Sequence, residues 1–158
     1  MKVLVDTSVW SLALRRKDAA ALTREEQRLK QELAQAIQDG RVVMIGMIRQ
    51  ELLSGIKEPA QYEKVKAALD AFLDEPINTA DHEYAARLYN ECRSHGCETG
   101  PVDMLICAVA LRRSWDVLSS DGALNRCLAA ARKFHEKQAK AAADTQRRHS
   151  SHTGGGKA

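Results

Sequence analysis

Aromatic residues are scarce in this sequence: Phe, Trp and Tyr make up 4% of its 158 residues. This scarcity disfavours a nucleic-acid binder that stacks bases on an aromatic platform. Long apolar runs are also missing, because the longest, Met104–Leu111, is far shorter than the roughly 20 residues of a membrane-spanning helix. The early apolar stretch Val3–Val5 is interrupted by Asp6, unlike a secretory signal. We therefore expect a cytoplasmic protein with no membrane association.

Several common site motifs are absent as well. The sequence contains no G-x-G-x-x-G, G-x-x-x-x-G-K-[ST], G-x-S-x-G or H-E-x-x-H pattern. The body of the chain has only His82 and His95, which leaves little for a metal-free ribonuclease built on two histidines. Four cysteines do not make a disulfide framework, and Cys92, His95 and Cys97 lack a second ligand pair at zinc-finger spacing. We expect reduced cysteines and no structural zinc.

The charge of the chain is concentrated at its C-terminal end. The net charge is +3, yet residues 132–158 carry seven Lys and Arg residues against two acidic ones. Apolar periodicity ends near Phe134, and the following sequence is rich in Ala, Lys and Gln. We therefore divide the chain into a domain over residues 1–134 and a basic, low-complexity tail over residues 135–158, which we expect to be disordered.

Short apolar segments alternate with helical patterns along the domain. Buried strands are predicted at Lys2–Asp6, Val42–Ile45 and Val117–Ser119. The pattern predicts a first helix that begins at Thr7 and a last helix from Gly122 onward. Between them it predicts helices over Leu22–Gln38, Met47–Ile56, Ala60–Leu73, Asp81–His95 and Pro101–Arg113. This alternation is typical of an α/β fold in three layers, with a short, mostly parallel sheet flanked by helices.

Four acidic residues occupy unusual positions in this arrangement. Asp6 ends the first predicted strand, and Asp121 follows the third. Asp103 lies in the first turn of a very apolar helix, and Glu51 interrupts an apolar stripe that should face the core. Asp6 and Asp121 could simply cap helices, and Asp103 could be an anion that stabilises a helix N-terminus, whereas Glu51 is the hardest to explain in such a way. Buried carboxylates are costly unless they are paired or bind a metal, so the set indicates a site for a hard cation such as Mg²⁺ or Mn²⁺.

The segments around these acids resemble four ordered motifs of one enzyme family. They read Asp6-Thr7-Ser8-Val9-Trp10, Gln50-Glu51-Leu52-Leu53-Ser54-Gly55, Asp103-Met104-Leu105-Ile106-Cys107-Ala108 and Leu118-Ser119-Ser120-Asp121. In order and spacing they look like the motifs of PIN-domain ribonucleases, and more narrowly those of VapC-type toxins from type II toxin–antitoxin pairs. The resemblance covers about residues 1–128.

This resemblance implies a metal-dependent endoribonuclease that hydrolyses RNA phosphodiesters and leaves a 3′-hydroxyl and a 5′-phosphate. Asp6, Glu51, Asp103 and Asp121 would hold one or two Mg²⁺ or Mn²⁺ ions, with the hydroxyls of Ser8 and Ser119 in support. Two features depart from the family: Leu124 stands where Phe is common, and residues 125–142 are predicted to be helical where a terminal strand often follows.

The resemblance also implies partners, namely an RNA substrate and a cognate antitoxin, and we expect a homodimer. Because acidic residues repel RNA, basic side chains must hold the flanking phosphates. The candidates for this role are Arg15, Arg16, Lys17, Arg112 and Arg113. An apolar groove formed by some of Trp10, Leu12, Leu53 and Ile56 is the expected seat of the antitoxin, with core packing as the other interpretation of these residues.

Two alternatives remain open from the sequence. The first is a non-catalytic PIN-like module that binds RNA or protein, although a pure binding module has no reason to keep four acids. The second is a phosphatase with Asp6 as the nucleophile, which is weakened because that chemistry usually needs a second Asp two residues later and position 8 is Ser.

Overall fold

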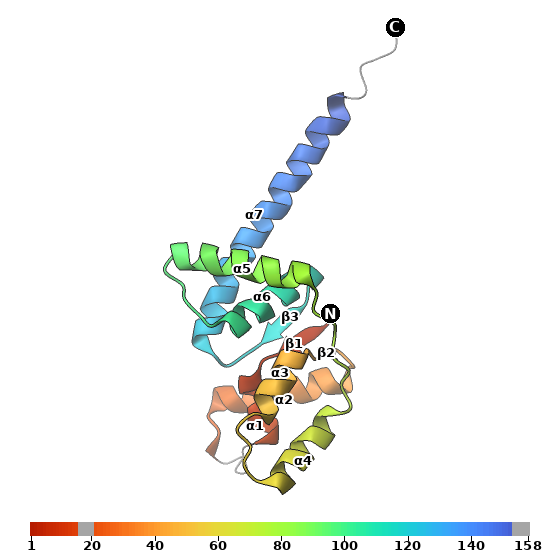
Figure 1. Ribbon diagram of the computed structural model, residues 1–158, viewed down its shortest axis with the longest axis vertical. Coiled ribbons are helices and arrows are strands. Elements are labelled where there is room, and N and C mark those ends of the chain that lie inside the picture. Colours follow the sequence, from red (N-terminus) through yellow and green to blue (C-terminus); the bar gives the residue numbers. More distant parts are fainter. Residues whose placement is uncertain (16–20, 153–158) are drawn as a thin grey trace.

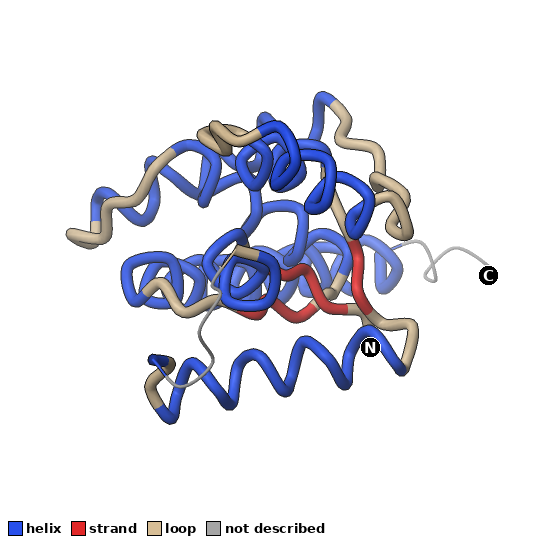
Figure 2. Tube along the Cα trace, turned by 90° about the horizontal axis from the view of Figure 1, so that it is seen from below, coloured by secondary structure: helices blue, strands red, loops and turns tan. Residues whose placement is uncertain are grey.

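The computed structural model describes residues 1–15 and 21–152. Its sheet contains β1 (Val3–Val5), β2 (Val42–Val43) and β3 (Asp116–Leu118) in the order β2-β1-β3. Both pairings are parallel, and Val3 lies opposite Val42 on one side and Asp116 on the other. All three residues of the central strand β1 are buried, as expected for a parallel strand that is covered on both faces. Figure 2 shows the short strands surrounded by helices.

Seven helices are present in the described part of the chain. They are α1 (Thr7–Leu14), α2 (Arg24–Gln38), α3 (Gly46–Leu53), α4 (Pro59–Leu69), α5 (Thr79–Ser94), α6 (Pro101–Arg113) and α7 (Gly122–His152). Local sequence explains where several begin: α2 and α5 start with capping boxes, while α4 and α6 start with proline at the first helical position.

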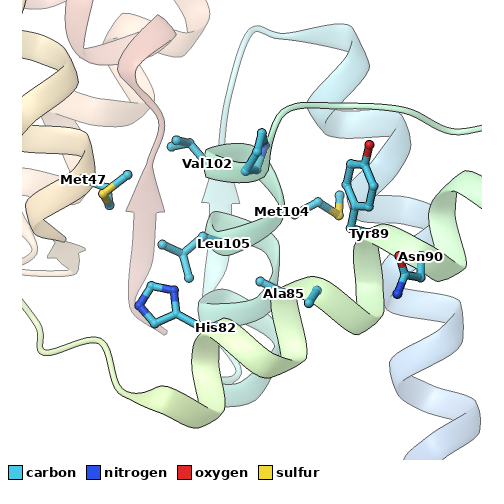
Figure 3. Close-up of a pocket in the computed structure, with 10 residues that line it drawn as sticks. Met47, His82, Ala85, Tyr89, Asn90, Val102, Met104 and Leu105 are labelled. Atoms are coloured by element: carbon cyan, nitrogen blue, oxygen red, sulfur yellow. The ribbon is translucent and has the colours of Figure 1, made fainter.

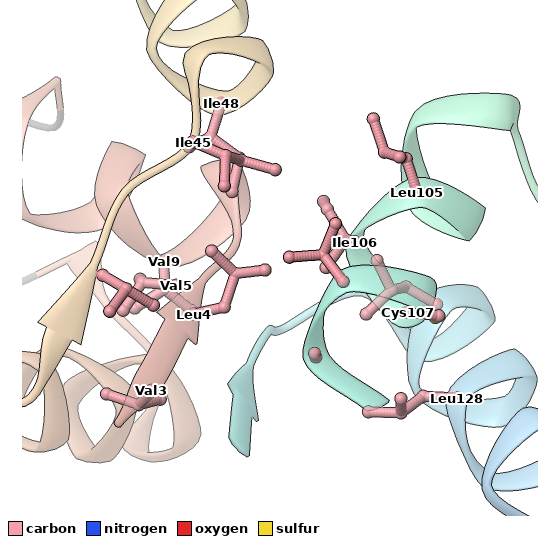
Figure 4. Packing of buried hydrophobic residues seen from close by; sticks show 14 of the residues in the cluster. Val3, Leu4, Val5, Val9, Ile45, Ile48, Leu105, Ile106, Cys107 and Leu128 are labelled. Atoms are coloured by element: carbon pink, nitrogen blue, oxygen red, sulfur yellow. The ribbon is translucent and has the colours of Figure 1, made fainter. Parts of the chain in front are cut away.

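The helices cover the sheet on both sides and complete a three-layer α/β fold. Helices α5, α6 and α7 pack on one another on one side, and α1 packs on α2 and α3 on the other (Figure 1). Helix α6 is the most buried, with eight consecutive buried residues from Met104 to Leu111. Figure 4 shows its Ile106 facing Leu4 of β1, and both side chains are fully buried. The predicted fold class is therefore confirmed.

The C-terminal region differs from our expectation of a disordered tail. Helix α7 continues without interruption to His152, and its side chains are exposed from Glu136 onward (Figure 1). The high helix propensity of Ala, Lys, Gln and Arg accounts for a helix without an apolar face. Residues 153–158 lie outside the described residues. None of the helices described here has the length and apolar character needed to cross a membrane.

Candidate active site

The four acidic residues singled out from the sequence converge at the carboxyl edge of the sheet. Asp6 directly follows β1, and Asp121 follows β3 after two serines. Glu51 is on α3, the helix entered from β2, and Asp103 is in the first turn of α6. Because all three strands are parallel, their carboxyl ends meet at one edge, which is where sites form in open α/β sheets.

Asp6 is the innermost of these acids and has only 6% of its surface exposed. The hydroxyls of Ser8 and Ser119 each donate a hydrogen bond of 2.8 Å to its Oδ2 atom. Although Asp6 precedes α1, its side chain makes no capping hydrogen bond. The two hydroxyls therefore stabilise a buried anion whose position is not explained by helix capping.

The two serines also connect the strand ends to each other. Their oxygens lie 3.3 Å apart. The backbone N–H of Asp121 donates to Ser119 Oγ at 3.0 Å, and that of Ser120 donates to Ser8 Oγ at 3.1 Å. The structure thus places Ser8 and Ser119, the two serines that the resemblance singles out, against Asp6, and these hydrogen bonds fix the turn that leads into Asp121.

Asp103 is half-buried, and its environment raises the pKa of its carboxyl group. Burial is the largest cause; a hydrogen bond of 2.5 Å from Thr99 Oγ1 to Oδ2 opposes it. The negative charges of Asp6, Asp121 and Glu51 raise this pKa further. The four acids therefore form one electrostatic group, which we call the acidic edge.

Glu51 and Asp121 form the exposed part of the acidic edge. The expectation that Glu51 points into the core is wrong, because α3 turns Ile48 and Leu52 inward instead. Thr7 Oγ1 donates a hydrogen bond of 2.9 Å to Glu51 Oε2. Asp121 Oδ1 accepts hydrogen bonds of 2.9 and 3.4 Å from the backbone N–H groups of Ala123 and Leu124 in the first turn of α7, so Asp121 also caps that helix.

Two residues of this site, Thr7 and Thr99, were not identified from the sequence. Each places a hydroxyl on one acid, Thr7 on Glu51 and Thr99 on Asp103. Thr99 precedes Asp103 by four residues, across the start of α6 at Pro101. The four-residue spacing could have indicated the contact of Thr99 with Asp103 from the sequence. The contact of Thr7 with Glu51 could not be predicted from the local sequence, because the two residues are 44 positions apart.

The chemistry of the donors fits a hard divalent cation. Among the described residues, hydrogen bonds engage one carboxylate oxygen of each acid, namely Asp6 Oδ2, Glu51 Oε2, Asp103 Oδ2 and Asp121 Oδ1. The second oxygen of each remains for a ligand, and Mg²⁺ prefers such oxygens. In these side-chain conformations, no three Asp, Glu, His or Cys side chains of the described residues could hold a metal ion together. Coordination of one ion by three of the acids would therefore require their carboxylates to rotate toward one another.

The structure gives two of the RNA-binding candidates another partner. Arg112 and Arg113 both form ion pairs with Asp81, which has no exposed surface; the Arg113 contacts are 2.9 Å. Burial alone raises the pKa of Asp81, but the hydrogen bonds from Arg113, Asn78 and Arg112 outweigh it and lower the pKa to about 2. Arg112 and Arg113 thus hold α5 against α6. Arg15 is exposed, and Arg16 and Lys17 lie outside the described residues.

An apolar cavity of about 420 Å³ adjoins the acidic edge between α5 and α6. Val102 and Met104, the neighbours of Asp103, line it together with Met47, which lies one helical turn before Glu51 (Figure 3). The groove expected from the sequence is not formed as such: Trp10 and Leu12 are buried in the core, and Leu53 and Ile56 are partly buried against it.

Comparisons with known proteins agree with this architecture. A family model described as PIN domain matches residues 3–128, which include all four acids. Among solved structures, the chain is similar to that of FitAcB from Neisseria gonorrhoeae, with a TM-score of 0.64 and 21% identity; the match covers 82% of this chain and 92% of the other. At this identity the likeness shows a common fold. A search of curated proteins gave no match.

Proposed function

The chain belongs to the PIN-domain family, and we propose that it is a metal-dependent endoribonuclease that hydrolyses RNA phosphodiesters, the toxin of a toxin–antitoxin pair. The observation that carries the nuclease proposal is the buried carboxylate of Asp6. It is held by two serine hydroxyls within a group of like-charged acids. Such an arrangement is costly for folding, and a cation that bridges the acids offsets the cost.

Each acidic residue has a role that follows from its environment. Asp6, Glu51, Asp103 and Asp121 would hold Mg²⁺ or Mn²⁺ through their available oxygens. A bound ion polarises a phosphoryl oxygen, lowers the pKa of water and stabilises the leaving oxygen. Ser8 and Ser119 keep Asp6 oriented. A carboxylate oxygen of Asp103 or Asp121 that is not bound to the ion would orient the attacking water.

Because the acidic edge is negatively charged, basic side chains near it must attract the phosphates of RNA. Arg15 at the end of α1 is exposed and remains a candidate for contact with a flanking phosphate. Arg126 is a second candidate: it is exposed, and its Nη1 atom lies over Gly122, the residue after Asp121. Both would act through phosphates, which carry no sequence information, so we propose no particular RNA.

The proposed antitoxin would bind across the acidic edge and the neighbouring apolar cavity. The negative edge is complementary to a basic side chain, and the cavity of about 420 Å³ fits an apolar side chain from the same segment. We therefore propose an antitoxin segment that carries both. We also propose that the protein is a homodimer and is located in the cytoplasm. The division of the chain into a domain over residues 1–134 and a tail over residues 135–158 is likewise a proposal.

The test of the nuclease proposal is cleavage of a fluorescent RNA in Mg²⁺ and in EDTA. We expect cleavage in Mg²⁺ and none in EDTA. Asp6→Asn, Glu51→Gln and Asp103→Asn should each abolish it in folded protein, because each removes an anionic ligand. Asp116→Asn is the matched control, since Asp116 is exposed at the start of β3, the opposite end of that strand. Full cleavage in EDTA, or by folded Asp6→Asn protein, would refute the proposal, and a folded protein that binds RNA without cleaving it would point to a binding module.

A further inference from the structure

Three cysteine side chains lie together where the end of α5 meets the beginning of α7. Helix α5 is followed by Gly96, which has a φ of 77°, and the N–H of Cys97 donates to the carbonyl of Cys92 at 2.8 Å. The N–H of Gly96 donates to Arg93 O at 3.0 Å. This helix ending brings the residue after the glycine against the last turn of the helix. Cys97 is thereby placed beside Cys92.

The third cysteine, Cys127, comes from the second turn of α7. Cys92 Sγ donates to the carbonyl oxygen of Cys127 at 3.7 Å. Cys97 and Cys127 line one cavity of about 330 Å³, together with Arg93 and Arg126. Cys97 and Cys127, which are 30 positions apart in sequence, thus line the same small cavity.

The three thiols differ in accessibility. Cys92 and Cys127 are buried, with 2% and 1% of their surface exposed, whereas Cys97 is partly exposed. Burial raises the pKa of Cys92, and burial followed by a hydrogen bond with the Cys97 thiol raises the pKa of Cys127 to about 11. Reactive thiols in proteins are those that are accessible and lie beside cationic groups. Of the three, Cys97 meets the first condition, and Arg93 and Arg126 are among the other residues that line its cavity.

We propose that Cys97 and Cys127 form a reversible, oxidant-responsive dithiol, with Cys97 as the thiol that meets a peroxide and Cys127 as the thiol that resolves it. The Cys97 thiolate attacks one oxygen of hydrogen peroxide, the O–O bond breaks, and hydroxide leaves to give a sulfenic acid. The Cys127 sulfur then attacks the Cys97 sulfur and displaces its hydroxyl group. The two thiol protons and the two hydroxyl groups end as two waters, peroxide gains two electrons, and each sulfur loses one.

In sequence, the two cysteines are close to residues of the candidate site. Cys97 precedes Thr99, the residue that holds Asp103, by two positions, and α7 begins directly after Asp121. A disulfide between Cys97 and Cys127 would therefore fasten the connection between α5 and α6 onto α7. The inference does not depend on the nuclease proposal, because its chemistry involves only the two cysteines.

Oxidation of the full-length, fully reduced protein tests the proposal directly. The protein is treated with hydrogen peroxide, its remaining thiols are alkylated after unfolding, and the digest is mapped by mass spectrometry. We expect two of the four thiols to be lost, a linked pair of peptides that contain Cys97 and Cys127, and recovery of both thiols on reduction with dithiothreitol. Cys97→Ser and Cys127→Ala should each abolish the link, and Cys92→Ala, the control, should keep it.

Three results would overturn the assignment. They are a link that includes Cys92, a link between two chains, and Cys97 oxidised to sulfinic or sulfonic acid while Cys127 stays reduced. Cys97 is partly exposed, so Cys97→Ser is the variant expected to fold without loss. Its circular dichroism spectrum must match that of the wild type for an absent link to count in favour of the proposal.

Discussion

Replacement of Asp103 by asparagine distinguishes between two roles of this residue. Asp103 either belongs to a cluster of mutually repelling acids or only stabilises a helix as an anion at its N-terminus. Asp103 lies in the first turn of α6, where an anion ordinarily contributes about 0.3–1 kcal/mol to stability. If that were its main role, Asp103→Asn would destabilise the protein. The acidic edge predicts the opposite sign in the absence of metal, because asparagine removes a partly desolvated charge that faces three other acids.

The sign follows from the direction of the pKa shift. Since the pKa of Asp103 is raised in the folded protein, the folded state binds more protons than the unfolded chain. Its stability therefore falls as the pH rises from about 4, the unfolded value, through the higher folded value. Asparagine keeps an oxygen that can accept from Thr99, so that hydrogen bond survives. We expect a net gain on the order of 1 kcal/mol at neutral pH, or about 2–4 °C in Tm for a domain of this size.

Thermal melts in EDTA and in Mn²⁺ measure both parts of this prediction. In EDTA, Asp103→Asn should melt above the wild type. In Mn²⁺ the order should reverse, because an ion at 100 times its Kd stabilises a folded state that binds it by about 2.7 kcal/mol. A variant that is less stable than the wild type in EDTA would refute the reasoning and leave Asp103 as a helix-stabilising anion.

Three further predictions follow from the same structure. Asp81→Asn should cost about 2 kcal/mol at pH 7, because it removes an anion whose pKa is lowered to about 2; urea unfolding should show the difference shrinking as the pH falls from about 4 toward 2. A chain that ends at Glu136 retains the 2.6 Å contact of Tyr84 with His135, so its Tm and its RNA cleavage should match those of the full chain. Expression of the wild type in bacteria should arrest growth, Asp6→Asn should not, and an adjacent gene product should relieve the arrest; a harmless but active enzyme would refute the toxin proposal alone.

The sheet and the convergence of the acids could be predicted because they depend on local patterns. Val3–Val5 is a short apolar run that ends in Asp6, and parallel strands bring such ends together whatever the details of packing. The supporting role of Ser8 and Ser119 was implied by the resemblance to PIN-domain ribonucleases, and both hydroxyls donate to Asp6.

The remaining differences arise from interactions between distant parts of the chain. The apolar neighbours of Glu51 suggested a buried face, but only the packing of α3 decides which side of the helix is covered. Arg112 and Arg113 look like a solvent-facing basic pair until Asp81, about 30 residues earlier, is brought beneath them. For α7, the missing apolar periodicity showed that the segment packs against little, but it did not exclude a helix formed through intrinsic propensity.

Binding of Mn²⁺, measured by titration calorimetry on metal-free protein, tests most directly whether the acidic edge is a cation site. The account predicts saturable binding to the wild type and to Asp116→Asn, and loss of that binding in Asp6→Asn and Asp103→Asn, with all four proteins folded. Equal binding by all four proteins, or none by the wild type, would contradict it.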